Sequence, residues 1–500
     1  MVERISRREM LKLSGAALGG LALGGCSASA GDAPPIPADF DELNPPFPLT
    51  QRNTLFANLA PMNPIEPVGA NEMRIAFMGT TVVQRRTQFC SSVYVELGNG
   101  ESFVFDCGAG VTVNYTAMQI PMSKMRKVFL THLHGDHTSD LTHLYCFGPQ
   151  QDGKSPLYVF GHSASGIEDP QIPGKYYDDG TLNFCRHFRE MNRWHTESQS
   201  FVPTRWKVGA EDGDGYDIIA TELDWRTGGR RTWTSADPYP EGAPVFRPSG
   251  WVAYEKNGVR ISFFPAVHDR NGSISYKLEW LDKGLSMIFA GDTKPNQFML
   301  DNATSGSTGV DVLIHEMVVP PEVWVVKNGG SVDDVAAMNL ARSIQENSHT
   351  PEKAFGYLMN EIAKRGKAPR LAVATHFQAE DDTIIKAMER IRSWYAGPVT
   401  VAADFMVLKV TRDSIDQRRA VVSDYSWDPP SAYPYASQGT YPPKYADTSS
   451  CNPYKPMAPL AQFDPSLLDK VVDPCLYDAS DFGCTNPYPY PCGVGKKSAT

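Results

Sequence analysis

The stretch "LTHLHGDHTSDL", residues 130–141, places three histidines and an aspartate within six consecutive positions. The whole chain of 500 residues has only 11 histidines, so this crowding needs a chemical reason. Burying several imidazoles and a carboxylate is costly unless each polar group has a partner. A divalent cation satisfies them together, because neutral imidazole and carboxylate are ligands of zinc and its first-row neighbours. Against the alternative of a polar loop that happens to be rich in histidine, we predict a metal site at His132, His134, Asp136 and His137.

The residues before this stretch place the metal site at the end of a strand. "KVFL", residues 127–130, is a short apolar run of the kind that forms a buried strand. Side chains on the loop after a strand are held by a rigid scaffold and stay open to substrate. The site is therefore predicted to be catalytic.

Three later strand candidates end on residues of the same chemical kind. "VRISFFPAVH", "SMIFAGD" and "LAVATH" end at His268, Asp292 and His376. One histidine in such a place is more often a hydrogen-bonded core residue, but the three bring the set to seven potential ligands. Seven ligands are too many for one tetrahedral ion and suit two ions that share a carboxylate. The pattern predicts a dinuclear site.

The remaining patterns indicate an α/β fold. "MRIAFMG" (73–79) predicts the first strand, and "SSVYVEL" and "SFVFD" predict a hairpin around an Asn-Gly turn. "DVLIHE" (311–316) predicts a further strand, and "TPEKAFGYLMNEIAKRG" predicts a helix capped by Thr350 and ended by Gly366. Strands followed by helices and another strand predict sheets sandwiched between helices.

Composition divides the chain into four parts. Residues 1–30 are an export signal, and residues 31–70 are a proline-rich arm expected to run extended over the surface. Residues 71–425 form the catalytic domain, and residues 426–500 are an irregular tail rich in proline, tyrosine and cysteine. Within the domain, residues 161–251 hold five of the nine tryptophans and predict an ordered aromatic-rich insertion with a small core of its own.

The first residues resemble a bacterial export signal. "SRREMLK", with Arg7 and Arg8, precedes the short apolar run "LSGAALGGLALGG", a pattern typical of twin-arginine signals. We therefore expect the twin-arginine translocation machinery as a partner and a periplasmic or secreted location. Cleavage after Ala30 is one outcome. The other is cleavage before Cys26, because "LGGC" resembles a lipoprotein box, and lipidation of Cys26 would give the expected membrane attachment. The run is too short and too weakly apolar to span a membrane.

The other cysteines fall into two groups. Four in the body of the chain are expected to be buried as small apolar side chains: Cys90, Cys107, Cys146 and Cys185. Four crowd the tail, and in an oxidising compartment they predict two disulfides with three pairings open: Cys451, Cys475, Cys484 and Cys492. A zinc knuckle is the less favoured interpretation, because the tail has no CxxC spacing.

The seven candidate ligands, taken in order, resemble those of the metallo-β-lactamase superfamily, whose HxHxDH motif is matched by "HLHGDH". The resemblance implies an αββα sandwich with the site at the strand ends. It also implies how the ligands divide: His132, His134 and His268 hold one ion, Asp136, His137 and His376 hold the second, and Asp292 bridges the two.

Further stretches resemble the ribonuclease Z, phosphodiesterase and arylsulfatase branch of that superfamily. They include "MGTTVVQRRTQFCSSVYVEL", "FDCGAG", "GDTKPN" and "NSHTPEKAFG", and the likeness covers roughly residues 73–160 and 255–410. In ribonuclease Z a glutamate supports a histidine that assists the leaving group, and the matching positions are Glu316 and His349. The chain departs from that pattern with HEMV in place of HEAT and with SHTP in the loop. A buried ion pair at Glu316 and a capped turn at His349 are the structural alternatives.

The resemblance implies a hydrolase of phosphodiester or sulfate ester bonds that acts through a metal-bridging hydroxide, and the signal at the start of the chain adds that the hydrolase is exported. Asp136 and Asp292 would orient the hydroxide, and His349 would protonate the leaving group. Zinc is the expected metal, with manganese and iron as alternatives. Lactone or β-lactam hydrolysis is the competing reaction, and a non-catalytic, metal-containing surface-binding protein is the competing class.

The partner is expected to be a small-molecule ester and not a nucleic acid. The net charge of −10 does not favour binding to a phosphate backbone, and the chain has no basic arm rich in glycine and proline to grip tRNA. The export signal points the same way.

Overall fold

The computed structural model describes residues 51–151, 156–198, 216–235 and 237–429. The predicted export signal, Cys26 and the four tail cysteines lie outside these residues. Among the residues described, no helix has both the length and the apolar character that crossing a membrane requires. The four cysteines of the body are buried and free, as expected.

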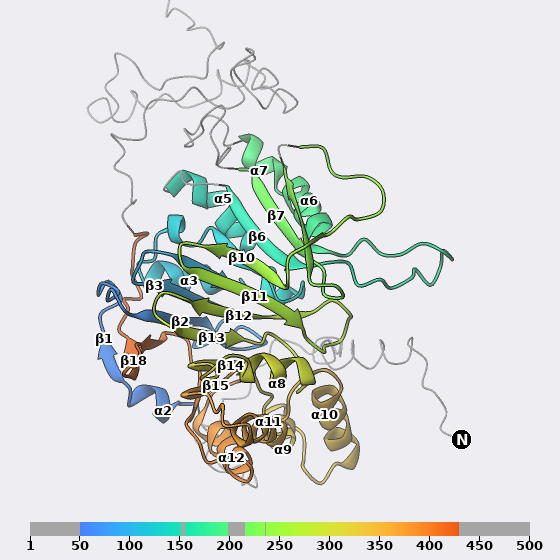
Figure 1. Ribbon diagram of the computed structural model, residues 1–500. Coiled ribbons are helices and arrows are strands. Elements are labelled where there is room, and N and C mark those ends of the chain that lie inside the picture. Colours follow the sequence, from blue (N-terminus) through green and yellow to red (C-terminus); the bar gives the residue numbers. More distant parts are fainter. Residues whose placement is uncertain (1–50, 152–155, 199–215, 236, 430–500) are drawn as a thin grey trace, which may run out of the picture. The chain divides into compact units, whose positions relative to one another are not determined.

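Two sheets carry the fold (Figure 1). Eleven strands of the described chain form the first sheet, in the order β1-β18-β17-β2-β3-β4-β5-β6-β7-β8-β9. Seven strands form the second sheet, in the order β10-β11-β12-β13-β14-β15-β16. The strands of the first sheet are β1 (Ala60–Met62), β2 (Met73–Gly79), β3 (Ser92–Leu97), β4 (Ser102–Phe105), β5 (Lys127–Phe129), β6 (Leu157–His162), β7 (Ile218–Leu223), β8 (Gly229–Thr234), β9 (Arg247–Pro248), β17 (Met406–Val410) and β18 (Ile415–Ala420). Those of the second sheet are β10 (Val252–Lys256), β11 (Val259–Pro265), β12 (Ile274–Trp280), β13 (Leu285–Phe289), β14 (Val312–Glu316), β15 (Leu371–Thr375) and β16 (Val399–Val401).

Helices cover the outer faces of the sheets. Figure 1 shows α3, α5 and α6 beside strands of the first sheet, and α8, α11 and α12 beside the second. The helices are α2 (Thr54–Ala57), α3 (Val111–Ala117), η2 (Met122–Lys124), α4 (Gly135–Thr138), α5 (Leu141–Gln151), α6 (Thr181–Met191), α7 (Arg193–Ser198), α8 (Gln297–Thr304), α9 (Pro321–Lys327), α10 (Val335–Ser348), α11 (Glu352–Lys364) and α12 (Asp381–Arg392).

The core between the sheets is aromatic at the end that leads to the metal-type residues. Phe105 and Phe129 of the first sheet stack with their ring centroids 5.5 Å apart. The ring centroid of Tyr276 in β12 lies 5.4 Å from that of Phe129, and the ring centroid of Phe289 in β13 lies 5.8 Å from that of Phe105. The two sheets therefore pack face to face, and the predicted αββα sandwich is confirmed.

Where the structure describes it, the aromatic segment 161–251 does not form a core of its own, so that expectation is wrong for these residues. Its described strands β7, β8 and β9 extend the first sheet, and β7 pairs in parallel with the whole of β6. Phe188 and Trp233 belong to the same core as Tyr115 of α3. The physical reason is that pairing with β7 satisfies the backbone groups that an edge strand β6 would leave open.

Two local predictions also need correction. The part of the arm that the structure describes is not simply extended, because it contains α2 and the edge strand β1, which pairs in parallel with β18. The sheet therefore begins at Ala60, ahead of the predicted domain boundary at 71.

Thr350 does not cap α11, because its hydroxyl donates to the carbonyl of Thr293 at 2.6 Å and Pro351 is the N-cap. That buried carbonyl competes successfully for the hydroxyl.

Candidate metal centre

The loop after β5 carries the first four candidate ligands into the site. Its backbone is fixed by Asp106, whose two carboxylate oxygens each accept a 2.8 Å hydrogen bond, one from Thr131 N and one from Thr131 Oγ1. The loop then enters the short helix α4, which contains Asp136 and His137. His132 and His137 are buried, while His134 stays exposed. The loop thus offers both a rigid and a solvent-facing part of the site.

Three strands of the second sheet deliver the other candidates. β11 leads to His268, β13 to Asp292 and β15 to His376. Since β13, β14 and β15 run parallel, their carboxyl ends meet at one edge of the sheet. This arrangement is why strand ends far apart in the sequence converge.

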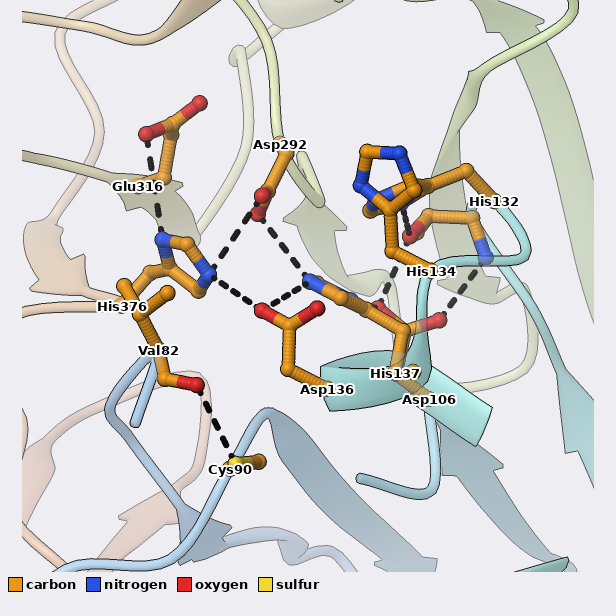
Figure 2. Close-up of polar contacts among 12 residues, drawn as sticks. Val82, Cys90, Asp106, His132, His134, Asp136, His137, Asp292, Glu316 and His376 are labelled. Carbon is orange, nitrogen blue, oxygen red and sulfur yellow. Dashed lines mark hydrogen bonds and ion pairs between the residues drawn. The ribbon is translucent and has the colours of Figure 1, made fainter. Parts of the chain in front are cut away.

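The structure brings all seven predicted ligands together, in two groups. His132, His134 and His268 each offer an atom within 4.8 Å of the others, and so do Asp136, His137, Asp292 and His376. In the second group each carboxylate contacts Nε2 of both histidines (Figure 2). An oxygen of Asp136 lies 3.4 Å from Nε2 of His137 and 3.2 Å from Nε2 of His376. The oxygens of Asp292 lie 3.4 Å and 3.3 Å from the same two atoms.

Asp292 lies between the two groups. Its Oδ2 atom is 3.3 Å from His376 Nε2 in the second group and 3.8 Å from His268 Nε2 in the first. The side chain is only 3% exposed, so it faces the histidines and not solvent. This is the position that a shared carboxylate would occupy.

Unpartnered atoms in the cluster show that the residues fit a cation. His132 Nε2, His137 Nε2 and Asp292 Oδ1 are buried and have no hydrogen-bond partner in the described part of the chain. Leaving a buried polar atom unpaired costs roughly 1–3 kcal/mol, and a bound cation removes that cost. The opposite ring atoms are held in place, since His137 Nδ1 contacts Asp106 Oδ2 at 2.7 Å and His268 Nδ1 contacts Ser348 O at 2.9 Å. Ligand histidines are oriented in this way.

The charges of the site favour metal binding. Burial lowers the pKa of His132 well below its ordinary value and also lowers that of His134, which favours the neutral imidazoles that bind a metal. Burial acts in the same direction on His137, but the carboxylates of Asp292 and Asp106 outweigh it and raise the pKa of His137 well above its ordinary value. A cation replaces the proton that these carboxylates would otherwise hold on His137.

His349 and Glu316 lie beside the ligand groups. His349 follows α10, and its Nδ1 contacts Glu316 Oε2 at 2.8 Å. The other oxygen of Glu316 accepts a 2.5 Å hydrogen bond from Thr293 N. Burial lowers the pKa of His349, but Glu316 more than offsets it and raises the pKa to about 9. Although these two residues could join His268 and Asp292 as a third ligand group, both oxygens of Glu316 are already engaged.

Asp106 is the functional residue for which the sequence analysis gave no role. It follows β4 directly, has a φ of +57°, and orients both the ligand loop and His137. The stretch "FDCGAG" that contains it also follows a predicted strand, so the strand-end pattern that found the other carboxylates applies to it.

Comparisons with known proteins identify relatives of this chain. Residues 73–164 match the family model described as "Anti-Pycsar protein Apyc1". Ribonuclease Z of Listeria monocytogenes serotype 4a (strain HCC23) is 35% identical over 256 residues, which cover 49% of this chain and 76% of the relative. Zinc phosphodiesterase ELAC protein 1 of Homo sapiens is 33% identical over 93 residues, 18% of this chain and 26% of the relative. The crystal structure of human tRNase Z, short form, aligns with a TM-score of 0.40 at 19% identity, covering 67% of this chain and 98% of that one.

The assignment of this chain to a family rests on the Listeria ribonuclease Z, because the similarity extends over three quarters of that protein's length. The two sheets and the convergence of the strand-end ligands are independent of that alignment and agree with it. The chain belongs to the ribonuclease Z-like branch of the metallo-β-lactamase superfamily, and it is a hydrolase of that fold.

Proposed function

We propose that this protein is an exported, dinuclear metal-dependent hydrolase of phosphodiester or sulfate ester bonds. The observation that carries the proposal is the pair of ligand groups joined by Asp292. A purely structural zinc ion is held by four protein ligands, so seven ligands are more than one structural ion needs. The names of the phosphodiesterase relatives favour an ester of phosphate.

The residues divide by the ion that they would hold. His132, His134 and His268 would bind one cation, and Asp136, His137 and His376 the other, with Asp292 shared. A bound divalent cation supplies Lewis acidity, which makes water acidic near neutral pH and takes up charge on an ester oxygen. Zinc suits a set this rich in imidazole, and manganese and iron are the alternatives.

Protein groups around the ions would orient the reactants. Asp136 and Asp292 both lie 3.4 Å from His137 Nε2, and their carboxylate oxygens could accept a hydrogen bond from a water molecule and align it for attack. Since Glu316 engages Nδ1 of His349, the Nε2 atom of that ring is left to hold a proton toward the leaving group. Glu316 thus sets the orientation of the proton donor.

The proposed substrate is a small ester and not a nucleic acid. With a net charge of −10, the protein has little attraction for a long polyanion. The ribonuclease activity in the relatives' names is therefore not carried over to this chain.

A panel of chromogenic substrates tests the proposed function. Protein purified without chelator would be assayed with bis(p-nitrophenyl) phosphate, p-nitrophenyl phosphate, p-nitrophenyl sulfate, a lactone and a chromogenic β-lactam. We expect the phosphodiester or the sulfate ester to react fastest, and chelator to abolish the reaction. Faster turnover of the lactone or the β-lactam would contradict the ester assignment.

Export is tested through the arginine pair of the signal. Replacing Arg7 and Arg8 with Lys should leave the precursor in the cytoplasm, folded and active, as measured by fractionation, immunoblot and ester hydrolysis. The Cys26→Ser variant is the matched control, because it keeps the arginine pair and should still be exported; loss of membrane attachment in this variant would show that Cys26 is lipidated. Unchanged periplasmic delivery of the Arg7→Lys, Arg8→Lys variant would show that a different route reads the signal.

A further inference from the structure

Gln88 is a buried glutamine next to the metal centre, and the proposed mechanism gives it no role. It is 2% exposed. A tight turn fixes its backbone, since Arg85 N donates to Gln88 O at 2.7 Å and Gln88 N donates to Arg85 O at 3.1 Å. The side chain therefore starts from a rigid position.

Every hydrogen-bonding position of the Gln88 amide is used. Nε2 donates to Thr80 Oγ1 at 2.8 Å and to the carbonyl of Phe377 at 3.0 Å. Oε1 accepts from Ala379 N at 3.0 Å and from the guanidinium of Arg85. One buried side chain thus holds the backbone at two points just after His376, a segment 289 residues away in sequence.

The backbone at His376 needs such support. His376 has a φ of +58°, a left-handed conformation that costs a non-glycine residue of the order of 1 kcal/mol or more. Thr80 assists from the same side, because its carbonyl accepts a 2.8 Å hydrogen bond from Phe377 N. The conformation persists where surrounding contacts determine it, and these contacts come from the segment that contains Thr80 and Gln88.

The ring of His376 lacks the support that its neighbours have. His137 and His268 each have Nδ1 within 2.9 Å of an oxygen, but His376 Nδ1 is buried with no hydrogen-bond partner among the described residues. The nearest carboxylate oxygen to it, Glu316 Oε2, is 4.0 Å away. Ligand histidines are normally oriented through this atom. The orientation of the His376 ring therefore depends on the conformation of its backbone.

We infer that Gln88 is a positioning residue for the second metal ion: it clamps the backbone after His376 and so directs Nε2 of that ring toward Asp136 and Asp292. The inference rests on the proposed role of His376 as a metal ligand. It predicts an unequal effect on the two ions, because the hydrogen bonds of the Gln88 amide reach the segment after His376 and none of them goes to His132, His134 or His268.

The test is metal binding by the full-length Gln88→Met variant, which keeps the side-chain length and removes the amide. Zinc titration against a chromophoric chelator should give two equivalents for the wild type. In the variant, one equivalent should keep its affinity and the other should weaken by roughly 10–100-fold, the size expected for a group that orients a ligand. Gln88→Glu, which keeps the acceptor and loses both donors, should weaken the same equivalent and serves if the first variant does not fold.

Asn192→Leu is the control for general destabilisation. Asn192 is 7% exposed at the end of α6, and its amide donates to the carbonyl of Phe188 at 2.8 Å, so the change also removes a buried amide-to-backbone bond. Both zinc equivalents should bind to it as in the wild type. Wild-type affinity of both equivalents in the folded Gln88 variants, or equal weakening of both, would overturn the inference. Fewer than two equivalents in the wild type would instead contradict the proposed dinuclear function.

Discussion

Asp292→Ala should lose bound metal and hydrolytic activity together. The carboxylate lies 3.8 Å from His268 in one ligand group and 3.3 Å from His376 in the other, so its removal weakens both ion sites at once. It also removes one of the two carboxylates that contact both His137 and His376, which leaves Asp136 alone beside those rings. We expect fewer than two metal equivalents by elemental analysis and an activity loss beyond the roughly 10–100-fold typical of outer residues that orient ligands.

Asp269→Ala is the matched control for this variant. Asp269 is also a carboxylate near His268, at 4.0 Å, but its side chain is 56% exposed and has no contact with the second group. Its metal content should stay near two equivalents per chain, with near-normal turnover of the best ester. A wild-type stoichiometry near one with full activity would contradict the dinuclear model, whatever the variants show.

Most strands that frame the site could be predicted because nearly all of their residues are buried. β5, β13 and β15 appear in the sequence as short, largely apolar runs, whereas β11 alternates buried residues with partly exposed ones such as Arg260 and Ser262. Each run stops where a ligand-type residue begins, so the chemical pattern and the strand pattern support one another. That coincidence made the seven residues recognisable before their positions in space were known.

The parts that could not be predicted depend on contacts between distant segments. The aromatic composition of 161–251 does not say whether its aromatic residues pack with one another or join the core that contains α3, as Phe188 and Trp233 do. Likewise, nothing local to Gln88 indicates Phe377, and nothing local to Asp106 indicates that it meets His137, 31 residues on. The pairing of β7 with β6 determines where the aromatic segment packs. Tertiary contacts determine the partners of Gln88 and Asp106.

His349→Ala should slow hydrolysis by an amount that depends on the leaving group. If Nε2 of His349 supplies a proton, esters of poor leaving groups such as alkoxides should lose roughly 10²–10⁴-fold in turnover, the usual size of general-acid catalysis. Nitrophenyl esters should lose little, because nitrophenolate departs without a proton. Turnover numbers for a series of esters with rising leaving-group pKa give the measurement, and a steeper dependence in the variant is the expected result.

The same series separates proton donation from the two structural roles that His349 could have. Metal content should remain at the wild-type level, because His349 already shares its Nδ1 with Glu316 and is not among the seven ligands. Glu316→Gln is the companion variant, since it keeps the shape but removes the negative charge beside the ring, and it should reproduce the dependence on leaving group in weaker form. An equal loss for all esters would assign His349 to substrate positioning, and a loss of metal would assign it to the third ligand group with His268, Asp292 and Glu316. Either result would remove the proton donor from the mechanism while leaving the metal centre in place.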